Sequence, residues 1–103
     1  MTRTPAHRAH LELAQWFYDH YQARIVEGAP KYGDFNPATD KRNMGSECIA
    51  EILDVGSYLE FGEQMRPDLT SHIQKMRAKT IILCGMARRL EEMMRTTEKE
   101  GTK

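Results

Sequence analysis

The sequence has little of the features that mark several large classes of protein. It contains only two cysteines, Cys48 and Cys84, and they form no CxxC or Cys/His metal-binding spacing. We therefore expect two buried thiols in a reducing compartment, with neither a disulfide nor a zinc site. No apolar run approaches the roughly 18 residues that a membrane-spanning helix needs, and the first ten residues lack the apolar core of a secretory signal. These absences predict a cytoplasmic protein that does not enter a membrane.

An overall excess of charge of either sign is also missing, because 15 Lys and Arg residues balance 15 Asp and Glu residues. A nucleic-acid-binding protein usually presents a one-signed basic face, and no such face is predicted here. The charge is nevertheless uneven along the chain. Residues 43–65 contain five acidic and no basic residues (−5), whereas residues 66–95 contain seven basic and three acidic residues (+4). Such a pair of segments can attract each other or hold a cation and an anion side by side.

Helical signals divide the chain into three long elements. Thr4 as N-cap and Pro5 at the first position predict a helix that runs to about residue 27, where Gly28 and Pro30 should stop it. The following stretch, PKYGDFNPATDKRN, has the composition of a loop. Asn43 or Ser46 can cap a second helix.

The second helix is predicted over residues 44–65, and a third over about residues 67–95, with a frayed polar tail at 96–103. The chain is long enough for one domain, residues 1–103. We therefore predict an all-α fold in which three long helices form a helical bundle. Since so short a chain leaves helical faces uncovered, homodimerisation, or a dimer of dimers, should complete the bundle.

The second predicted helix carries a row of acidic side chains. At 100° per residue, Glu47, Glu51, Asp54 and Tyr58 fall within about 60° of one another. Apolar residues flank the row, and like charges three and four residues apart cost about 0.2 to 0.5 kcal/mol per pair. A hard divalent cation such as Mg²⁺ would offset this repulsion, since it prefers oxygen ligands. The alternatives are an ordinary solvated face, or pairing with cations of the third helix: Lys75, Arg77, Lys79 and Arg88.

The segment KYGDFNPATD, followed by SECIAEILDVGSYLE, resembles the MazG-like all-α nucleoside triphosphate pyrophosphohydrolases, especially their small phage or prophage members. The resemblance covers about residues 31–60. It implies that Glu47, Glu51 and Asp54 bind Mg²⁺, or Mn²⁺, and that Lys31 contacts a substrate phosphate. Tyr58 could stack or donate a hydrogen bond at the edge of the site, or simply pack as an aromatic side chain. The implied activity is release of pyrophosphate from a nucleoside triphosphate.

The sequence departs from that family at one point. Members usually carry an E-E-x-x-E motif on the preceding helix, and the first predicted helix has none. Its acidic residues Glu12, Asp19 and Glu27 are spread over about 20 Å, too far apart for one ion. A second chain could complete the site across a dimer, or the protein could be a relative that has lost catalysis. The alternative function is a non-catalytic helical dimer that acts as a protein-interaction module.

Overall fold

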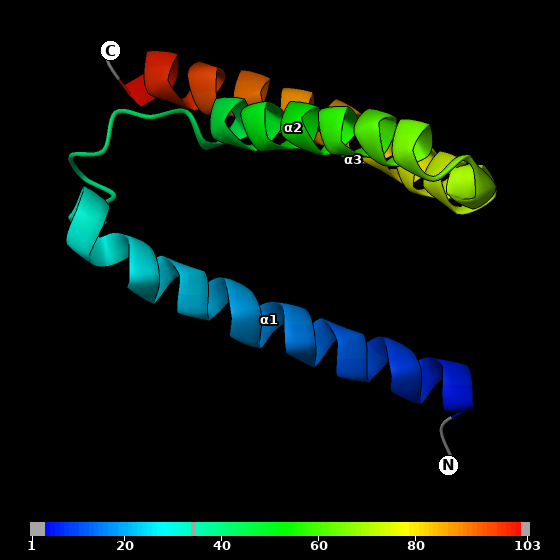
Figure 1. Ribbon diagram of the computed structural model, residues 1–103. Coiled ribbons are helices and arrows are strands. Elements are labelled where there is room, and N and C mark those ends of the chain that lie inside the picture. Colours follow the sequence, from blue (N-terminus) through cyan, green and yellow to red (C-terminus); the bar gives the residue numbers. More distant parts are fainter. Residues whose placement is uncertain (1–3, 34, 102–103) are drawn as a thin grey trace. The chain divides into compact units, whose positions relative to one another are not determined.

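The computed structural model describes the backbone of residues 4–33 and 35–101, and their side chains except at 31, 32 and 97–101. All regular secondary structure in this part of the chain is helical (Figure 1). Its elements are α1 (Pro5–Tyr32), α2 (Met44–Met65), a short 3₁₀ helix η1 (Pro67–Leu69) and α3 (Thr70–Gly101). The all-α class and the three long helices predicted from the sequence are thus confirmed. The chain divides into two compact units, Met1–Asp40 and Lys41–Lys103.

Helix α1 begins as predicted and ends later than predicted. The Thr4 hydroxyl accepts a hydrogen bond from the His7 N–H at 3.1 Å, which caps the helix. The helix continues through Pro30 to Tyr32 and ends at Gly33, whose φ of 80° places it in the left-handed region. The predicted stop at residues 28–30 is therefore wrong. Pro30 lacks the N–H of an ordinary helical residue, and beyond it the Gly33 N–H donates to the Ala29 carbonyl at 2.8 Å and closes the last turn.

The apolar side chains of α1 are not covered within the unit that contains this helix. Phe17 and Ile25 expose 62% and 61% of their surface. Several rings contact one another along the helix instead, with Phe17 and Tyr21 centroids 5.4 Å apart and Trp16 stacked on His20 at 4.1 Å. The unit that contains α1 therefore contributes no buried side chain among its described residues.

Helix α2 has the bounds predicted from the sequence. The Asn43 side chain accepts from the Ser46 N–H at 3.2 Å, so Asn43 is the N-cap. At the other end, Arg66 donates to both carboxylate oxygens of Asp68, at 2.8 and 2.6 Å, across the turn into η1. Helix α3 begins at Thr70, after η1, and continues to Gly101, whereas the third helix was predicted over about residues 67–95 with a frayed tail at 96–103. Residues 102–103 of that tail lie outside the described residues. The Thr96 hydroxyl, which donates to the Glu92 carbonyl at 3.0 Å, lies within this continuous helix.

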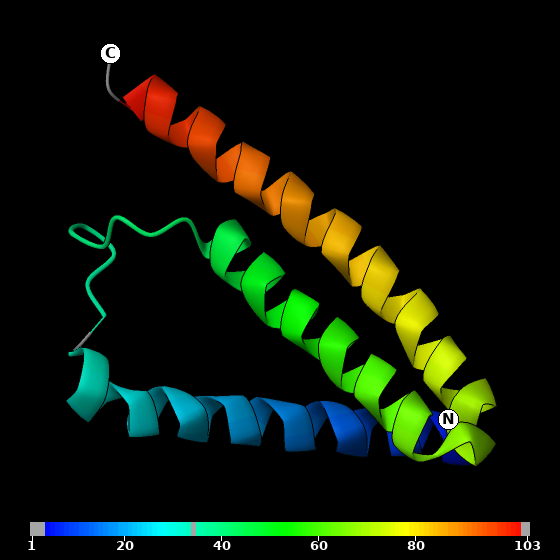
Figure 2. The same ribbon diagram turned by 45° about the horizontal axis from the view of Figure 1, so that its top comes forward.

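Helices α2 and α3 pack side by side as an antiparallel hairpin, hereafter the hairpin (Figure 2). The buried apolar side chains are Ile52 and Leu59 on α2, and Ile73 and Ala87 on α3. Residues seven apart recur in the seam, as in a coiled coil, which keeps one line of each helix against the other. The core is thin, since no described side chain is fully buried. Within the described residues, no helix is both long and apolar enough to cross a membrane.

Candidate functional site

The predicted carboxylates form a row along the outer side of α2, away from its contact with α3. Helical geometry places Glu47, Glu51 and Asp54 about 80 to 160° around the helix from the buried line of Ile52 and Leu59. All three carboxylates are exposed. The name "carboxylate row" is used below for these three residues. Helix α2 thus presents one acidic side chain per turn to whatever lies beside it.

The cations that could neutralise the carboxylate row within one chain lie elsewhere. Arg77 pairs with Glu63 at 3.4 Å and with Glu60 at 3.7 Å, near the turn of the hairpin. The charge of Arg88 acts on Glu91. Among the described residues, no Lys or Arg side chain forms an ion pair with the carboxylate row. The row therefore retains its like-charge repulsion within a single chain.

The chemistry of the carboxylate row suits a hard cation, although the row alone is not a full coordination sphere. In the described part of the chain, no group of three or more His, Cys, Asp or Glu side chains lies close enough together to hold a metal ion. Mg²⁺ does not need so many protein ligands, because it keeps several waters and is commonly held by one or two carboxylates together with substrate phosphates. Oxygen donors on a solvent-exposed face fit that mode of binding.

Of the two remaining predicted site residues, the structure describes the side chain of Tyr58 but not that of Lys31. Tyr58 lies on the same face of α2 as the carboxylate row and exposes 70% of its surface. It is thus free to contact a ligand or a second molecule. The side chain of Lys31 lies outside the described residues, and its backbone belongs to the last turn of α1. The structure therefore gathers four of the five predicted residues on one helix face and leaves the phosphate contact of Lys31 untested.

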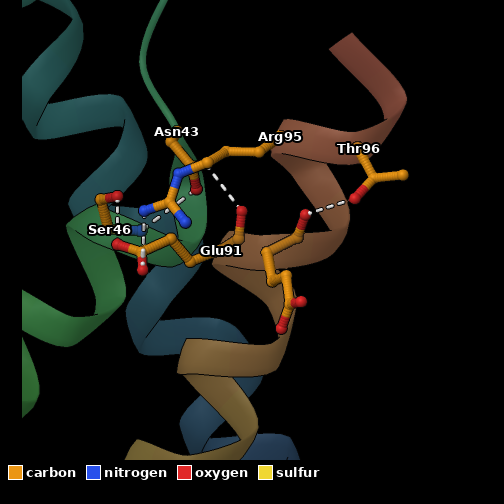
Figure 3. Close-up of polar contacts among 6 residues, drawn as sticks. Asn43, Ser46, Glu91, Arg95 and Thr96 are labelled. Carbon is orange, nitrogen blue, oxygen red and sulfur yellow. Dashed lines mark hydrogen bonds and ion pairs between the residues drawn. The ribbon is translucent and has the colours of Figure 1, made fainter. Parts of the chain in front are cut away.

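Sequence reasoning missed a polar cluster that holds the open end of the hairpin together (Figure 3). The Asn43 Nδ2 donates to the Glu91 carbonyl oxygen at 3.0 Å, and the Ser46 hydroxyl donates to Glu91 Oε2 at 2.6 Å. Arg95 pairs with Glu91 Oε1 at 3.0 Å. The cap of α2 by Asn43 was predictable. The hydrogen bond from Asn43 to the Glu91 carbonyl was not predictable, because it joins residues 48 positions apart.

Electrostatics in this cluster favour the charged form of Glu91. The hydrogen bond from Ser46 lowers the pKa of the Glu91 carboxyl below its ordinary value, and the positive charges of Arg95 and Arg88 act in the same direction against partial burial. Gly45 lies directly beneath, since a Cβ added there would lie 2.2 Å from the Glu91 backbone nitrogen. The start of α2, and with it Glu47, is thus fixed against α3 by close backbone approach and by hydrogen bonds.

Both cysteines are free thiols, but they are not both buried. Cys48 is exposed on α2, and Cys84 is half-buried on α3. The prediction of a buried Cys48 is wrong because position 48 lies beside the seam, where the hairpin alone does not cover it. Cys84, in contrast, lines the groove between the two helices.

Comparison with known proteins identifies no relative, since no protein-family model, no curated protein and no solved structure matches the chain.

Proposed function

We propose that this protein is a Mg²⁺-dependent nucleoside triphosphate pyrophosphohydrolase that works as a homo-oligomer. The observation that carries the proposal is the carboxylate row, three carboxylates on one exposed face of α2 without cationic partners among the described residues. The resemblance of residues 31–60 to MazG-like enzymes supplies the chemistry. The reaction would break the bond between the α- and β-phosphates with one water, and would yield a nucleoside monophosphate and pyrophosphate.

In this proposal each residue has a separate task. Glu47, Glu51 and Asp54 hold the cation, which when bound offsets phosphate charge and acidifies water. Lys31 provides a point charge for a phosphate, and the exposed Tyr58 ring borders the nucleotide. Glu12, Asp19 and Glu27 of α1 are too widely spaced to hold the same ion, so waters and substrate phosphates would complete the coordination of the cation.

The direct test is pyrophosphate release from each standard ribo- and deoxynucleoside triphosphate, with Mg²⁺ or Mn²⁺. We expect release from at least one of them, and loss of release in the double variant Glu51→Gln, Asp54→Asn. The matched control is Glu60→Gln, which removes a charge from the same helix outside the carboxylate row. Release from none of the substrates, or equal activity of the double variant and the wild type, would contradict the proposal.

A second candidate function, a non-catalytic interaction module, is favoured by the apolar surface of the hairpin. Phe61, Ile82 and Met86 expose 57%, 65% and 65% of their surface, and large exposed apolar areas commonly mark protein interfaces. This function predicts that removing the carboxylate row does not change the binding of any divalent cation. If the wild type binds Mn²⁺ and the double variant Glu51→Gln, Asp54→Asn does not, protein interaction cannot be the sole function.

A further inference from the structure

The hairpin has two faces between its helices, and they differ in the charged side chains that border them. On one face, Leu53 of α2 and Ile81 of α3 line a shallow groove. Charged side chains border that groove, because Arg77 lines it and is held there by Glu60 and Glu63. The groove face is therefore rimmed by an ion-pair network that water can reach.

The opposite face is apolar over its whole length. Val55 and Leu83 each lie about 40 to 80° from the buried line of their helix, on the side away from Leu53 and Ile81. A seven-residue spacing repeats on this side of both helices, so its members align along the hairpin. We call this the apolar face; its members are Cys48, Val55, Leu69, Met76, Leu83 and Leu90.

The apolar face is too exposed for a hairpin with so small a core. Leu83 exposes 53% of its surface, Leu69 43% and Met76 42%. The unit that contains the hairpin spans Lys41–Lys103, and its described part buries four apolar side chains. Units of this size rarely gain enough from such a core, and they are commonly completed by association.

The two long edges of the apolar face have opposite charge. Beyond Val55, the carboxylate row follows the outer edge of α2, starting with Glu51 about 40° further around the helix. Beyond Leu83, Lys79 occupies the equivalent position on α3, and Lys75 and Arg89 continue that edge; these three residues form the basic edge. Neither edge contains a described residue of the other sign.

From these observations we infer that a second copy of this chain covers the apolar face, with α2 of each copy lying over α3 of the other. Two hairpins can pack through this face about a two-fold axis parallel to the helices, or about one perpendicular to them. The perpendicular axis stacks α2 on α2 and brings two carboxylate rows together. The parallel axis places each carboxylate row beside the partner's basic edge, so charge complementarity selects it.

This arrangement forms a four-helix bundle and gives the carboxylate row a cationic neighbour that its own chain does not provide. It does not depend on the proposed hydrolase activity, because apolar packing and edge charge are sufficient to form it. Any anionic ligand held near the row would then lie beside Lys79 of the partner subunit.

The test uses the full chain in sedimentation equilibrium at low ionic strength. We expect a dimer for the wild type, a monomer for Leu83→Glu, and a dimer for the matched control Ile81→Glu, whose exposed side chain lines the groove on the other face of the hairpin. A monomeric wild type, or a dimeric Leu83→Glu that retains wild-type helicity, would overturn the inference.

The orientation is tested by charge reversal at surface positions that do not affect folding of the core. Lys79→Glu, Arg89→Glu should raise the dimer Kd roughly tenfold or more at low salt, with the difference fading at high salt. Gly45 lies beside Glu91, so an axis parallel to the helices brings Glu47 level with the partner's Arg89. Adding Glu47→Lys, Asp54→Lys to the same chain should therefore restore the dimer. An unchanged or tighter dimer in Lys79→Glu, Arg89→Glu would contradict this orientation. Failure of pyrophosphate release would leave both results unchanged, so the two proposals fail separately.

Discussion

At the scale of single residues, Gly45 makes the closest approach between α2 and α3. An added Cβ would lie 2.2 Å from the Glu91 nitrogen and 2.4 Å from its Cα, and backbone atoms cannot move aside as a flexible side chain could. We predict that Gly45→Ala lowers the free energy of unfolding by about 1 to 3 kcal/mol, despite the better helix propensity of alanine. Urea denaturation measures this change in the free energy of unfolding.

Gly56 provides the control for Gly45, because it lies on the same helix with nothing within 4 Å of an added Cβ. Gly56→Ala should raise the free energy of unfolding by up to about 1 kcal/mol. A loss of stability at position 56 as large as that at position 45 would show that close approach to Glu91 is not the cause.

Glu91 makes the stability of the hairpin depend on pH in the acid range. Its pKa is lowered in the folded protein, first by the Ser46 hydroxyl and then by Arg95. The resulting stabilisation is therefore complete above the unfolded pKa, near 4.5, and is lost as the pH falls through the lower folded value. Ser46→Ala should flatten this part of the stability profile between about pH 5 and pH 3.

The pH effect is measured by thermal unfolding of both proteins across this range. Asp68, whose pKa is lowered by its hydrogen bonds from Arg66, titrates in the same window but is unchanged by the substitution. The difference between the two profiles therefore reports Glu91. Parallel profiles for Ser46→Ala and the wild type would contradict the assignment.

At the scale of elements, Asn43 has two roles that substitution can separate. Its side chain caps α2 through the Ser46 N–H and also donates to the Glu91 carbonyl of α3. Asn43→Ala should cost about 1 to 2 kcal/mol, because both interactions are lost. Asn43→Ser keeps a capping oxygen but is too short to reach α3, so its cost should be smaller. Equal costs in urea denaturation would mean that the cap alone matters.

The sequence was sufficient to predict most of the elements and less of their packing. The bounds of α2 follow from local signals, with Asn43 at one end and Arg66-Pro67 at the other. The end of α1 was misjudged because Gly28 and Pro30 predicted a stop, whereas Gly33, which ends the helix, was not singled out. Local sequence thus predicted both ends of α2 and the start of α1, but not the end of α1.

At the scale of the whole molecule, the sequence predicted the carboxylate row but not its surroundings. Helical periodicity alone places Glu47, Glu51 and Asp54 on one face, and the structure agrees. That Arg77 pairs with Glu60 and Glu63 rather than with the row depends on how α2 and α3 align, which no local signal encodes. The same alignment creates the apolar face and its oppositely charged edges.

The proposed function depends most directly on whether the carboxylate row binds a divalent cation. Titration of Mn²⁺, followed by its electron paramagnetic resonance signal, measures this without a substrate. We predict that Glu51→Gln, Asp54→Asn weakens Mn²⁺ binding roughly tenfold or more and that Mg²⁺ displaces Mn²⁺ from the wild type. The control, Glu60→Gln, Glu63→Gln, removes the same charge from α2 and should bind as the wild type does. Equal Mn²⁺ affinity for all three proteins would contradict the account.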